Sequence, residues 1–349
     1  MKIAQLVSNL HDVNARSNHA IYSHAGILAD AFVEKNHDVT LFASANSKTK
    51  AKLNGWPPSN ISQLSLPENI RRHYTHSLIS QCYNKAENFD IIHSHFTLLS
   101  SFYANLVDTP TVSSIHSPIT DEIKPLMKQF KNNRYISFSH SQRQQFPELN
   151  WVANIYHGVD TDLFAYNETP GDYFLYIGRI TEEKGIHYAI EAAKAAGVKL
   201  LIAGRSYATE GYWHTQLEPH IDGVNVSYVG EADLERKIEL YRNAKGLLFP
   251  TQYDEVFGLV MIEAMSCGTP VIGWNKGSVP EVIQDGETGY LVSSVEEMTE
   301  AIKNIDKIDR KACRRRVEEL FSVDKMVRSY LRVYERIIAE WKRELEEAK

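Results

Sequence analysis

Short apolar runs alternate with amphipathic segments along most of the chain, and this order predicts strands alternating with helices. The run Tyr173–Ile177 (YFLYI) is typical of a strand buried on both faces of a sheet. The other predicted strands are Lys2–Val7, Asp38–Ala43, Asp90–His93, Thr111–Ile115, Tyr135–Ser139, Lys199–Ala203, Val224–Val229, Gly246–Phe249 and Pro270–Gly273. Such alternation indicates α/β architecture, in which helices cover both faces of parallel sheets.

Helical periodicity marks the segments between these strands. The predicted helices are Tyr22–Glu34, Ile186–Ala196, Asp233–Asn243, Leu259–Met265 and the long charged segment Asp324–Lys349. Gly197 follows the second of them and Cys267-Gly268 follows the fourth. Because glycine readily adopts the left-handed conformation that ends helices, both positions predict helix C-termini.

A turn-rich segment separates two α/β series. Residues Trp151–Phe164, and YNETPGD after them, are predicted to form a loop. The length of 349 residues also exceeds that of one ordinary core. We therefore predict two Rossmann-like domains, 1–165 and 166–325, with a ligand-binding cleft between them and a helix, 326–349, that packs back on the first domain.

Composition narrows the classes of function. The net charge is −6, and no run of basic residues interleaved with aromatics occurs, so nucleic acid is not expected as a partner. The cysteines Cys82, Cys267 and Cys313 are far apart, which argues against a disulfide framework and fits a reducing, cytoplasmic location. No apolar stretch approaches the roughly 20 residues that span a bilayer. Only peripheral membrane contact, through the C-terminal helix, is left open.

A cation comes soon after the predicted strand Tyr173–Ile177, and a second lies five residues further on, at the start of the next predicted helix. Arg179 and Lys184 lie in YIGRITEEKG, and Gly185 lets the backbone come close to a ligand. A helix N-terminus with two cations suits a diphosphate. The alternative is a solvated surface turn in which neighbouring glutamates balance the charge.

Two glutamates in DEVFGLVMIEAMSCGTPVI, one before the predicted helix and one within it, are candidate ligand-binding residues. Glu255 precedes this helix, and Glu263 lies near its end among apolar residues, so Glu263 should be partly buried and should need partners. Its carboxylate is suited to accept both hydroxyls of a ribose, whereas Glu255 should lie nearer the transferred group. At the helix start, the backbone N–H groups of Gly258, Leu259 and Val260 can face an anion.

Together these segments resemble the retaining glycosyltransferases of family 4, whose members have the GT-B fold. The resemblance runs from about Lys2 to Val292 and is strongest in the C-terminal half. It is carried by IGRITEEKG, LLIAGR, YVG, YHGVDTDLF and FPTQYDEVFGLVMIEAMSCGTPVIGWNKGSVPEVIQDGETGYLV, in the order and spacing of the family.

The resemblance assigns roles to individual residues. It implies that Arg179 and Lys184 bind the donor diphosphate, and that Glu255 and Glu263, an E-x7-E motif, contact the donor sugar and the ribose. His116, in VSSIHSP, matches a family histidine that faces the donor sugar from across the cleft. The implied catalytic set is His116, Glu255, Arg179 and Lys184; the implied nucleotide-sugar set is Arg179, Lys184, Phe257, Gly258, Leu259, Val260 and Glu263.

The reaction implied is metal-independent transfer of a hexose, with retention, from a nucleotide-diphosphate sugar. A UDP-sugar is favoured over a GDP-sugar, and no further cofactor is expected. The acceptor, a small molecule, an oligosaccharide or a lipid-linked sugar, is left open, as is the oligomeric state. Two alternatives are a sugar-nucleotide epimerase or hydrolase of the same fold and a non-catalytic protein that binds nucleotide sugars.

One departure from the family pattern lies in the loop after the first strand. The family usually has a glycine pair there, whereas this chain has Ser17 and Asn18 at about that place. The close backbone approach that glycine permits is therefore not expected. The acceptor side should differ from the family norm.

Two strings resemble metal sites without their usual context. Asp160-Thr161-Asp162 spells the DxD of metal-dependent GT-A enzymes but lies beside no nucleotide-binding motif, so a turn is predicted. His93 and His95 share one face of a strand end, as a metal pair would. No carboxylate or cysteine stands nearby in the sequence, so we predict a packed loop and no metal site.

Overall fold

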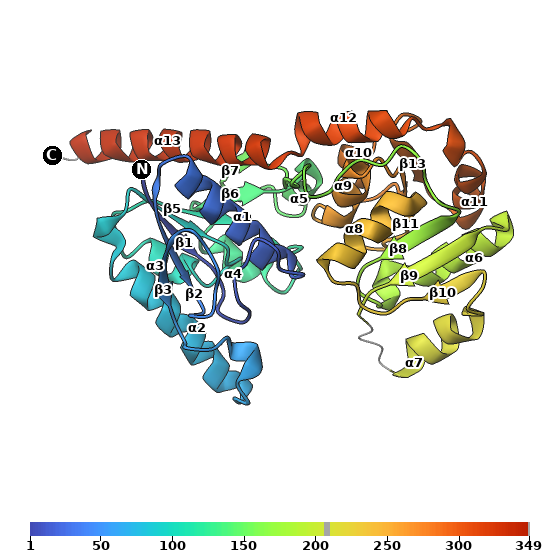
Figure 1. Ribbon diagram of the computed structural model, residues 1–349. Coiled ribbons are helices and arrows are strands. Elements are labelled where there is room, and N and C mark those ends of the chain that lie inside the picture. The colour runs from blue at the N-terminus through green and yellow to red at the C-terminus, as the bar shows by residue number, and fades with distance from the viewer. Residues whose placement is uncertain (206–209, 348–349) are drawn as a thin grey trace. The chain divides into compact units, whose positions relative to one another are not determined.

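In the computed structural model, residues 1–205 and 210–347 are described, and they form two compact α/β units (Figure 1). The N-terminal unit comprises Met1–Ile155 and Met326–Lys349, and the C-terminal unit comprises Tyr156–Lys325. The division therefore falls earlier than the boundary at 165 that the sequence suggests. Residues 156–165 join the C-terminal unit because the backbone N–H of Val159 donates to the carbonyl of Phe321 (2.8 Å).

The N-terminal unit is built on a seven-stranded parallel sheet of order β3-β2-β1-β4-β5-β6-β7. Its strands are β1 (Lys2–Leu6), β2 (Asp38–Ala43), β3 (Lys52–Gly55), β4 (Ile91–Ser94), β5 (Thr111–Ser114), β6 (Arg134–Ser137) and β7 (Trp151–Asn154). Its helices are α1 (Ala20–Glu34), α2 (Glu68–Tyr83), α3 (Ser101–Ala104), α4 (Lys124–Lys128), α5 (His140–Gln144) and α13 (Val323–Glu347). The strand order reverses between β1 and β4, which is where such sheets bind ligands.

One part of the predicted interdomain loop is wrong. Trp151–Asn154 forms the edge strand β7, which pairs with β6 through Tyr135↔Trp151 and Ile136↔Ala153. All four residues of β7 are only half-buried. The apolar part of this edge strand, Trp151–Ala153, is shorter than the four residues that usually mark a strand, and turn formers follow it, so the sequence pattern does not predict it.

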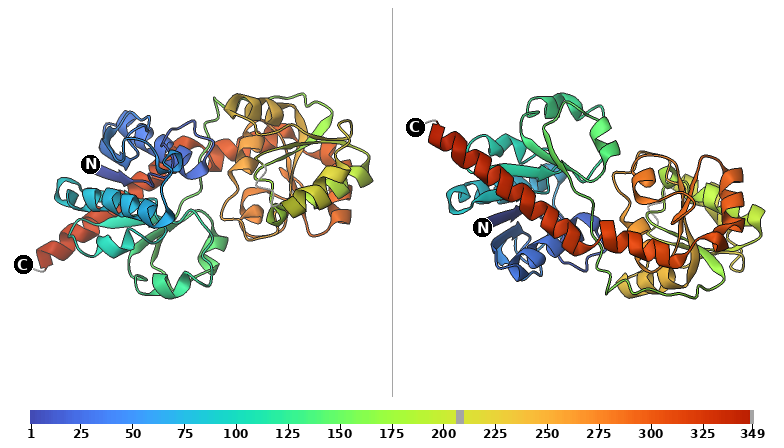
Figure 2. Two further views of the ribbon diagram at one scale, coloured as in Figure 1. Left: turned by 90° about the horizontal axis from the view of Figure 1, so that it is seen from below. Right: turned by 90° about the horizontal axis from the view of Figure 1, so that it is seen from above.

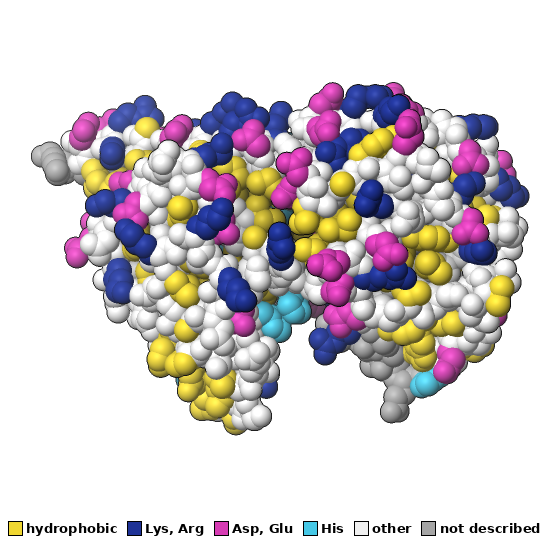
Figure 3. Space-filling model, in the orientation of Figure 1, with side chains coloured by type: hydrophobic (Ala, Val, Ile, Leu, Met, Phe, Trp, Pro, Cys, Tyr) yellow, Lys and Arg dark blue, Asp and Glu magenta, His cyan; other side chains and the backbone are white. Residues whose placement is uncertain are grey.

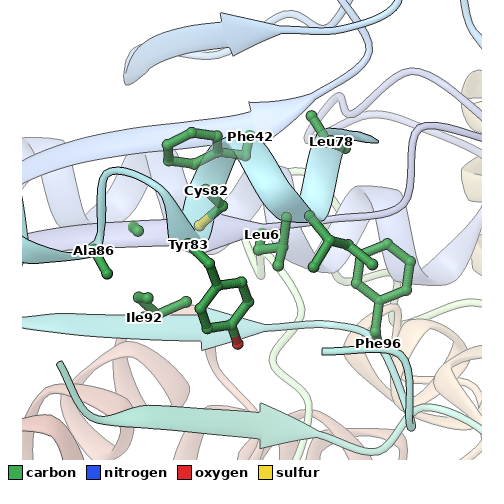
Figure 4. Close-up of a cluster of buried hydrophobic side chains, with 10 residues drawn as sticks. Leu6, Phe42, Leu78, Cys82, Tyr83, Ala86, Ile92 and Phe96 are labelled. Atoms are coloured by element: carbon green, nitrogen blue, oxygen red, sulfur yellow. The ribbon is translucent and has the colours of Figure 1, made fainter. Parts of the chain in front are cut away.

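The two faces of the N-terminal sheet bury different helices. On one face, Leu6, Phe42 and Ile92 pack against α2, as Figure 4 shows. Burial raises the pKa of the Cys82 thiol in this cluster, so the thiol stays protonated and packs as an apolar group. Because side chains alternate along a strand, Gln5 and His93 point to the opposite face, which α1 and α13 cover.

Helix α13 is bound to the N-terminal unit by hydrogen bonds as well as by packing. The Tyr330 hydroxyl lies 3.0 Å from Ser114 Oγ, and the Tyr334 hydroxyl lies 2.6 Å from His93 Nδ1. Figure 2 shows this helix running across the sheet. Its described part ends at Glu347, and Ala348 and Lys349 of the predicted helix lie outside the described residues.

The C-terminal unit contains a six-stranded parallel sheet of order β10-β9-β8-β11-β12-β13. Its strands are β8 (Tyr173–Ile177), β9 (Lys199–Ala203), β10 (Val226–Tyr228), β11 (Ala244–Phe249), β12 (Val271–Trp274) and β13 (Gly289–Val292). Its helices are α6 (Ile186–Ala196), α7 (Glu210–Tyr212), α8 (Leu234–Asn243), α9 (Leu259–Ser266), α10 (Val279–Val282), α11 (Val295–Lys303) and α12 (Arg310–Leu320). Here the order reverses between β8 and β11.

The predicted ends of α6 and α9 are confirmed. Gly197 follows α6 with φ 68°, and Gly268 follows α9 with φ 86°, both in the left-handed region. The two α/β series predicted from the apolar pattern are likewise confirmed as two parallel sheets.

The surface carries charges of both signs. On the face shown in Figure 3, Lys and Arg side chains are interspersed with Asp and Glu side chains. None of the helices within the described ranges combines the length and the apolar character that a membrane span requires.

Candidate functional site

The predicted donor-site residues of the C-terminal unit occupy two loops that leave neighbouring strands. Arg179 and Lys184 follow β8, and Glu255 and Gly258 follow β11. Strands β8 and β11 pair in parallel at the point where the strand order reverses, so both loops leave the same edge of the sheet. This edge is the usual ligand position in open α/β sheets.

Lys184 is held in a nearly closed environment. Its Nζ lies 2.6 Å from Glu255 Oε2, and the two side chains are only 12% and 16% exposed. The same ammonium lies 4.6 Å from the ring centroid of Tyr253, whose hydroxyl also donates to Glu255 (2.8 Å). Burial and the neighbouring Glu255 raise the pKa of Tyr253, which keeps the hydroxyl protonated as a donor. These contacts thus hold the ammonium group of Lys184 in place before any ligand binds.

Arg179 is held less firmly than Lys184. Its guanidinium lies 3.4 Å from Glu183 Oε1, and both side chains are more than half exposed. Such surface pairs contribute about 0–1 kcal/mol, so this contact alone does not fix the side chain. Arg179 is also close enough to Tyr253 to lower the pKa of that hydroxyl, against the larger effect of burial. Arg179 and Lys184 therefore both approach the Tyr253–Glu255 pair.

Gly185 brings the loop after β8 against the loop after β11. It has φ +69°, and an added Cβ would lie 2.2 Å from the carbonyl oxygen of Pro250. We expect Gly185→Ala to lower the free energy of unfolding by more than the about 1–2 kcal/mol that a left-handed conformation costs. Urea denaturation measures this difference.

The matched control for that substitution is Gly197→Ala. Gly197 has nearly the same φ, +68°, but an added Cβ there would meet no atom within 4 Å. Gly197→Ala should therefore lower the free energy of unfolding only by the cost of placing alanine in the left-handed conformation. Equal losses in the two variants would contradict the close contact between the two loops.

Glu263 has the partial burial and the partners that its sequence context predicts. Its side chain is 13% exposed, accepts a hydrogen bond from the Tyr241 hydroxyl (2.8 Å) and pairs with Lys237 Nζ (3.0 Å). Lys237 and Tyr241 come from one face of α8, four residues apart. Sequence reasoning missed both partners, although their spacing on a predicted helix was a usable signal.

The N-terminus of α9 lies in the same loop as Glu255. Gly258 adopts φ +82° immediately before the helix, and the N–H groups of Leu259 and Val260 belong to its first turn, which has no acceptor within the helix. Phe257, by contrast, is 2% exposed and packs its ring against His157, so only its backbone can meet a ligand.

Ser278 braces this loop and was not singled out from the sequence. Its hydroxyl donates to the carbonyl of Phe257 (2.9 Å), and its N–H donates to the carbonyl of Glu255 (3.1 Å). A single serine thereby holds the backbone on both sides of the turn that leads into α9.

His116 lies in the N-terminal unit, just after β5. Its Nε2 is 3.0 Å from His95 Nδ1, and burial lowers its pKa to about 3. The imidazole of His116 is therefore neutral at pH 7. Its assignment to the donor sugar stays a prediction.

The loop that lacks the glycine pair folds without left-handed residues. The backbone N–H of Ser17 donates to the Asn14 carbonyl (2.9 Å), and the N–H of His19 donates to Ser17 Oγ (3.2 Å). Within residues 1–205 and 210–347, Asn36 is the non-glycine residue with positive φ. This loop is thus shaped by side-chain and backbone hydrogen bonds.

Asp160-Thr161-Asp162 forms the turn expected of it, whereas His93 lies in strand β4 and not in a loop. Asp160 Oδ1 accepts the N–H groups of Asp162 (3.0 Å) and Leu163 (3.1 Å), which is a turn-forming arrangement. His93 is fully buried and contacts Ser114 Oγ (2.8 Å) and Tyr334. The ring centroid of His95 lies 4.3 Å from that of His93. The ring nitrogens of His95 contact His116 and Gln5.

Comparison with known proteins links both units to one class of enzyme. The profile described as Glycosyltransferase Family 4 matches residues 23–163, and that described as Glycosyl transferases group 1 matches residues 160–319. The chain is 24% identical over 277 residues to an uncharacterized glycosyltransferase of Methanocaldococcus jannaschii, an alignment covering 72% of this chain and 77% of the relative.

Two solved structures share the architecture over nearly the whole chain. The sucrose-phosphate synthase of Thermosynechococcus elongatus superposes with a TM-score of 0.75 at 22% identity, covering 97% of this chain and 100% of the other. Anabaena HepE, solved with UDP-glucose, superposes with a TM-score of 0.70 at 16% identity, covering 96% and 99%. At such identities the likeness establishes the fold.

Proposed function

Because this chain belongs to the family 4 glycosyltransferases and has their GT-B fold, we propose that it transfers a hexose from a nucleotide-diphosphate sugar, with retention at the anomeric carbon. The observation that carries this proposal is the cluster of Arg179, Lys184 and Glu255 beside the N-terminus of α9. Two cations and a helix N-terminus at the ligand-binding edge of a sheet form a diphosphate site.

The proposed chemistry follows from this charge arrangement. As the bond between the anomeric carbon and the diphosphate oxygen breaks, its electron pair moves onto the diphosphate. Arg179 and Lys184 stabilise that charge, and because Lys184 is already fixed by Glu255 and Tyr253, little reorganisation is needed. The acceptor hydroxyl oxygen forms the new bond to the anomeric carbon, and its proton passes to the departing diphosphate oxygen. The positive charge that a divalent metal supplies in other glycosyltransferases comes here from side chains and the α9 dipole.

In this proposal, Glu255 and Glu263 contact different parts of the donor. Glu263 keeps acceptor capacity beyond its bonds to Lys237 and Tyr241, because a carboxylate offers about four lone-pair sites, and it binds the ribose hydroxyls. Glu255, beside Lys184, lies toward the diphosphate and the sugar. The likeness to HepE, which was solved with UDP-glucose, supports UDP over GDP as the donor nucleotide.

Thermal unfolding with nucleotides tests the donor site directly. We expect UDP at 100 times its dissociation constant to raise the Tm by about 5–10 °C, because such occupancy stabilises the folded state by about 2.7 kcal/mol. UMP, which lacks the second phosphate, should give a smaller shift. Measured at one concentration of nucleotide, this difference reports the combined contribution of Arg179, Lys184 and the N-terminus of α9.

The outcomes separate the competing functions. A larger shift with GDP or ADP than with UDP would overturn the choice of nucleotide, and no shift with any nucleoside diphosphate would overturn the donor site. Release of UDP from a UDP-sugar only when an acceptor is added indicates transfer. Equal release without an acceptor indicates a hydrolase or an epimerase, and binding without release across an acceptor panel indicates a non-catalytic protein.

A further inference from the structure

Three histidines from distant parts of the sequence meet in the N-terminal unit. His24 comes from α1, His95 follows β4 and His116 follows β5. One ring nitrogen from each lies within 4.8 Å of the other two, and His24 and His95 are buried while His116 is half-buried. The histidine cluster, as we call these three residues, lies on the sheet face that α1 and α13 cover.

The spacing of the cluster is close to that of a metal site. Imidazole nitrogens bind Zn²⁺ at about 2.0–2.1 Å in tetrahedral geometry, which puts two ligand atoms about 3.4 Å apart. His95 Nδ1 and His116 Nε2 are 3.0 Å apart. The ring centroid of His24 lies 5.2 Å from that of His116 and 5.6 Å from that of His95. The ligand nitrogen of His24 lies within 4.8 Å of those of His95 and His116. A small rotation of the His24 side chain therefore brings all three nitrogens to the spacing that a tetrahedral ion needs.

The residues around the cluster resemble the outer shell of a metal centre. The fully buried Gln5 accepts a hydrogen bond from His95 Nε2 through its side-chain carbonyl (2.8 Å), which leaves the lone pair on Nδ1, the atom facing His116. Metal-binding histidines usually donate their second N–H in this way. The Tyr330 hydroxyl, 3.3 Å from His24 Nε2, orients that ring, and Phe138 packs against His116 with a centroid distance of 4.7 Å.

We propose that the histidine cluster binds a divalent transition-metal ion of the Zn²⁺ class, with its fourth position open. The set contains imidazoles and no carboxylate, so it favours Zn²⁺, Co²⁺, Ni²⁺ or Cu²⁺ over Mg²⁺ and Ca²⁺. The half-buried His116 gives the ion a path from solvent. Where His116 also serves the transfer reaction, which rests on the function proposed above, the bound ion competes with that role and inhibits the enzyme.

Cobalt titration of the untagged, chelator-treated full chain tests the site. We expect one Co²⁺ per chain, with the visible ligand-field absorption of a tetrahedral ion, displacement by Zn²⁺ and no displacement by Mg²⁺. His24→Gln should weaken Co²⁺ affinity about 10- to 100-fold, since even the loss of an outer partner costs that much. Co²⁺ binding needs no nucleotide, and the Tm shift with UDP needs no metal, so each proposal can fail alone.

Two further variants guard against a folding artefact. Tyr330→Phe removes only the hydroxyl that faces His24 and should still lower Co²⁺ affinity about 10-fold. His19→Gln is the matched control, because His19 is exposed and stacks on His11 outside the cluster (centroids 4.1 Å apart). Absence of the tetrahedral absorption in the wild type would overturn the proposal. So would a loss of affinity in His19→Gln with none in His24→Gln and Tyr330→Phe.

Discussion

Replacing Lys184 with alanine should lower turnover about 10- to 150-fold, because a charge-assisted contact to the departing diphosphate is worth about 1.5–3 kcal/mol and each 1.4 kcal/mol is about tenfold in rate. The effect should appear in kcat, since the diphosphate gains charge as the bond breaks. Lys184 is 12% exposed and already fixed by Glu255, so its charge acts without reorganisation. Arg179→Ala should fall in the lower part of this range, because Arg179 is 54% exposed and loosely paired.

Initial-rate kinetics with a UDP-sugar measure both losses. Lys184→Ala leaves the half-buried carboxylate of Glu255 with Tyr253 as its remaining described side-chain partner, so thermal melts must accompany the rates. A double variant, Lys184→Met with Glu255→Gln, removes both charges of the pair, and its thermal melt shows whether an unpaired Glu255 is what destabilises Lys184→Ala. Lys194→Ala, an exposed lysine on α6, is the matched control and should keep its activity. Full turnover in both Arg179→Ala and Lys184→Ala would exclude the proposed role.

The buried strands could be predicted because their composition has one physical interpretation. Asp38–Ala43, Tyr173–Ile177 and Lys199–Ala203 match the observed strands residue for residue. An apolar run flanked by turns can satisfy its backbone and bury its side chains only inside a sheet. The edge strands β3 and β7 could not be predicted in this way, since their residues are exposed or half-buried and their apolar runs are shorter than four residues.

The same distinction applies to the candidate site, because residue types indicate that a side chain needs a partner but do not identify that partner. The apolar surroundings of Glu263 show that it needs partners, but they do not identify Lys237 and Tyr241. Likewise, Lys184 and Glu255 each suggest a charged site, yet their 2.6 Å contact joins residues 71 positions apart. A sequence states a chemical requirement locally, whereas the fold decides which distant residue meets it.

The histidine cluster could not be predicted from residues that are neighbours in the sequence, because its members come from three distant segments. His93 and His95 suggested a metal pair, and the absence of a third ligand nearby in the sequence argued against it. In the structure His93 is occupied by Ser114 and Tyr334, while His95 gains His24 and His116 as neighbours from two other elements. The third ligand comes from α1, which no local pattern near His95 could indicate.

Glu263→Gln should weaken UDP binding about 30- to 150-fold with much less effect on turnover at saturating donor. The glutamine keeps the size of the side chain, but two charge-assisted hydrogen bonds to ribose become neutral ones, a loss of about 1–1.5 kcal/mol each. Lys237, 3.0 Å from Glu263 and only 17% exposed, also loses its counter-charge. Titration calorimetry with UDP measures the affinity, and steady-state kinetics measure turnover.

Glu235→Gln is the matched control, because Glu235 is an exposed carboxylate on α8, the same helix that supplies Lys237 and Tyr241. It should bind UDP as the wild type does. Unchanged affinity in Glu263→Gln would remove Glu263 from the ribose site. The contrast with Lys184→Ala is the sharper test: ribose contacts form equally in the ground and transition states and so act on binding, whereas contacts to the departing diphosphate strengthen only as the bond breaks. If both variants changed affinity alone, the cluster around Lys184 would hold a nucleotide without catalysing transfer.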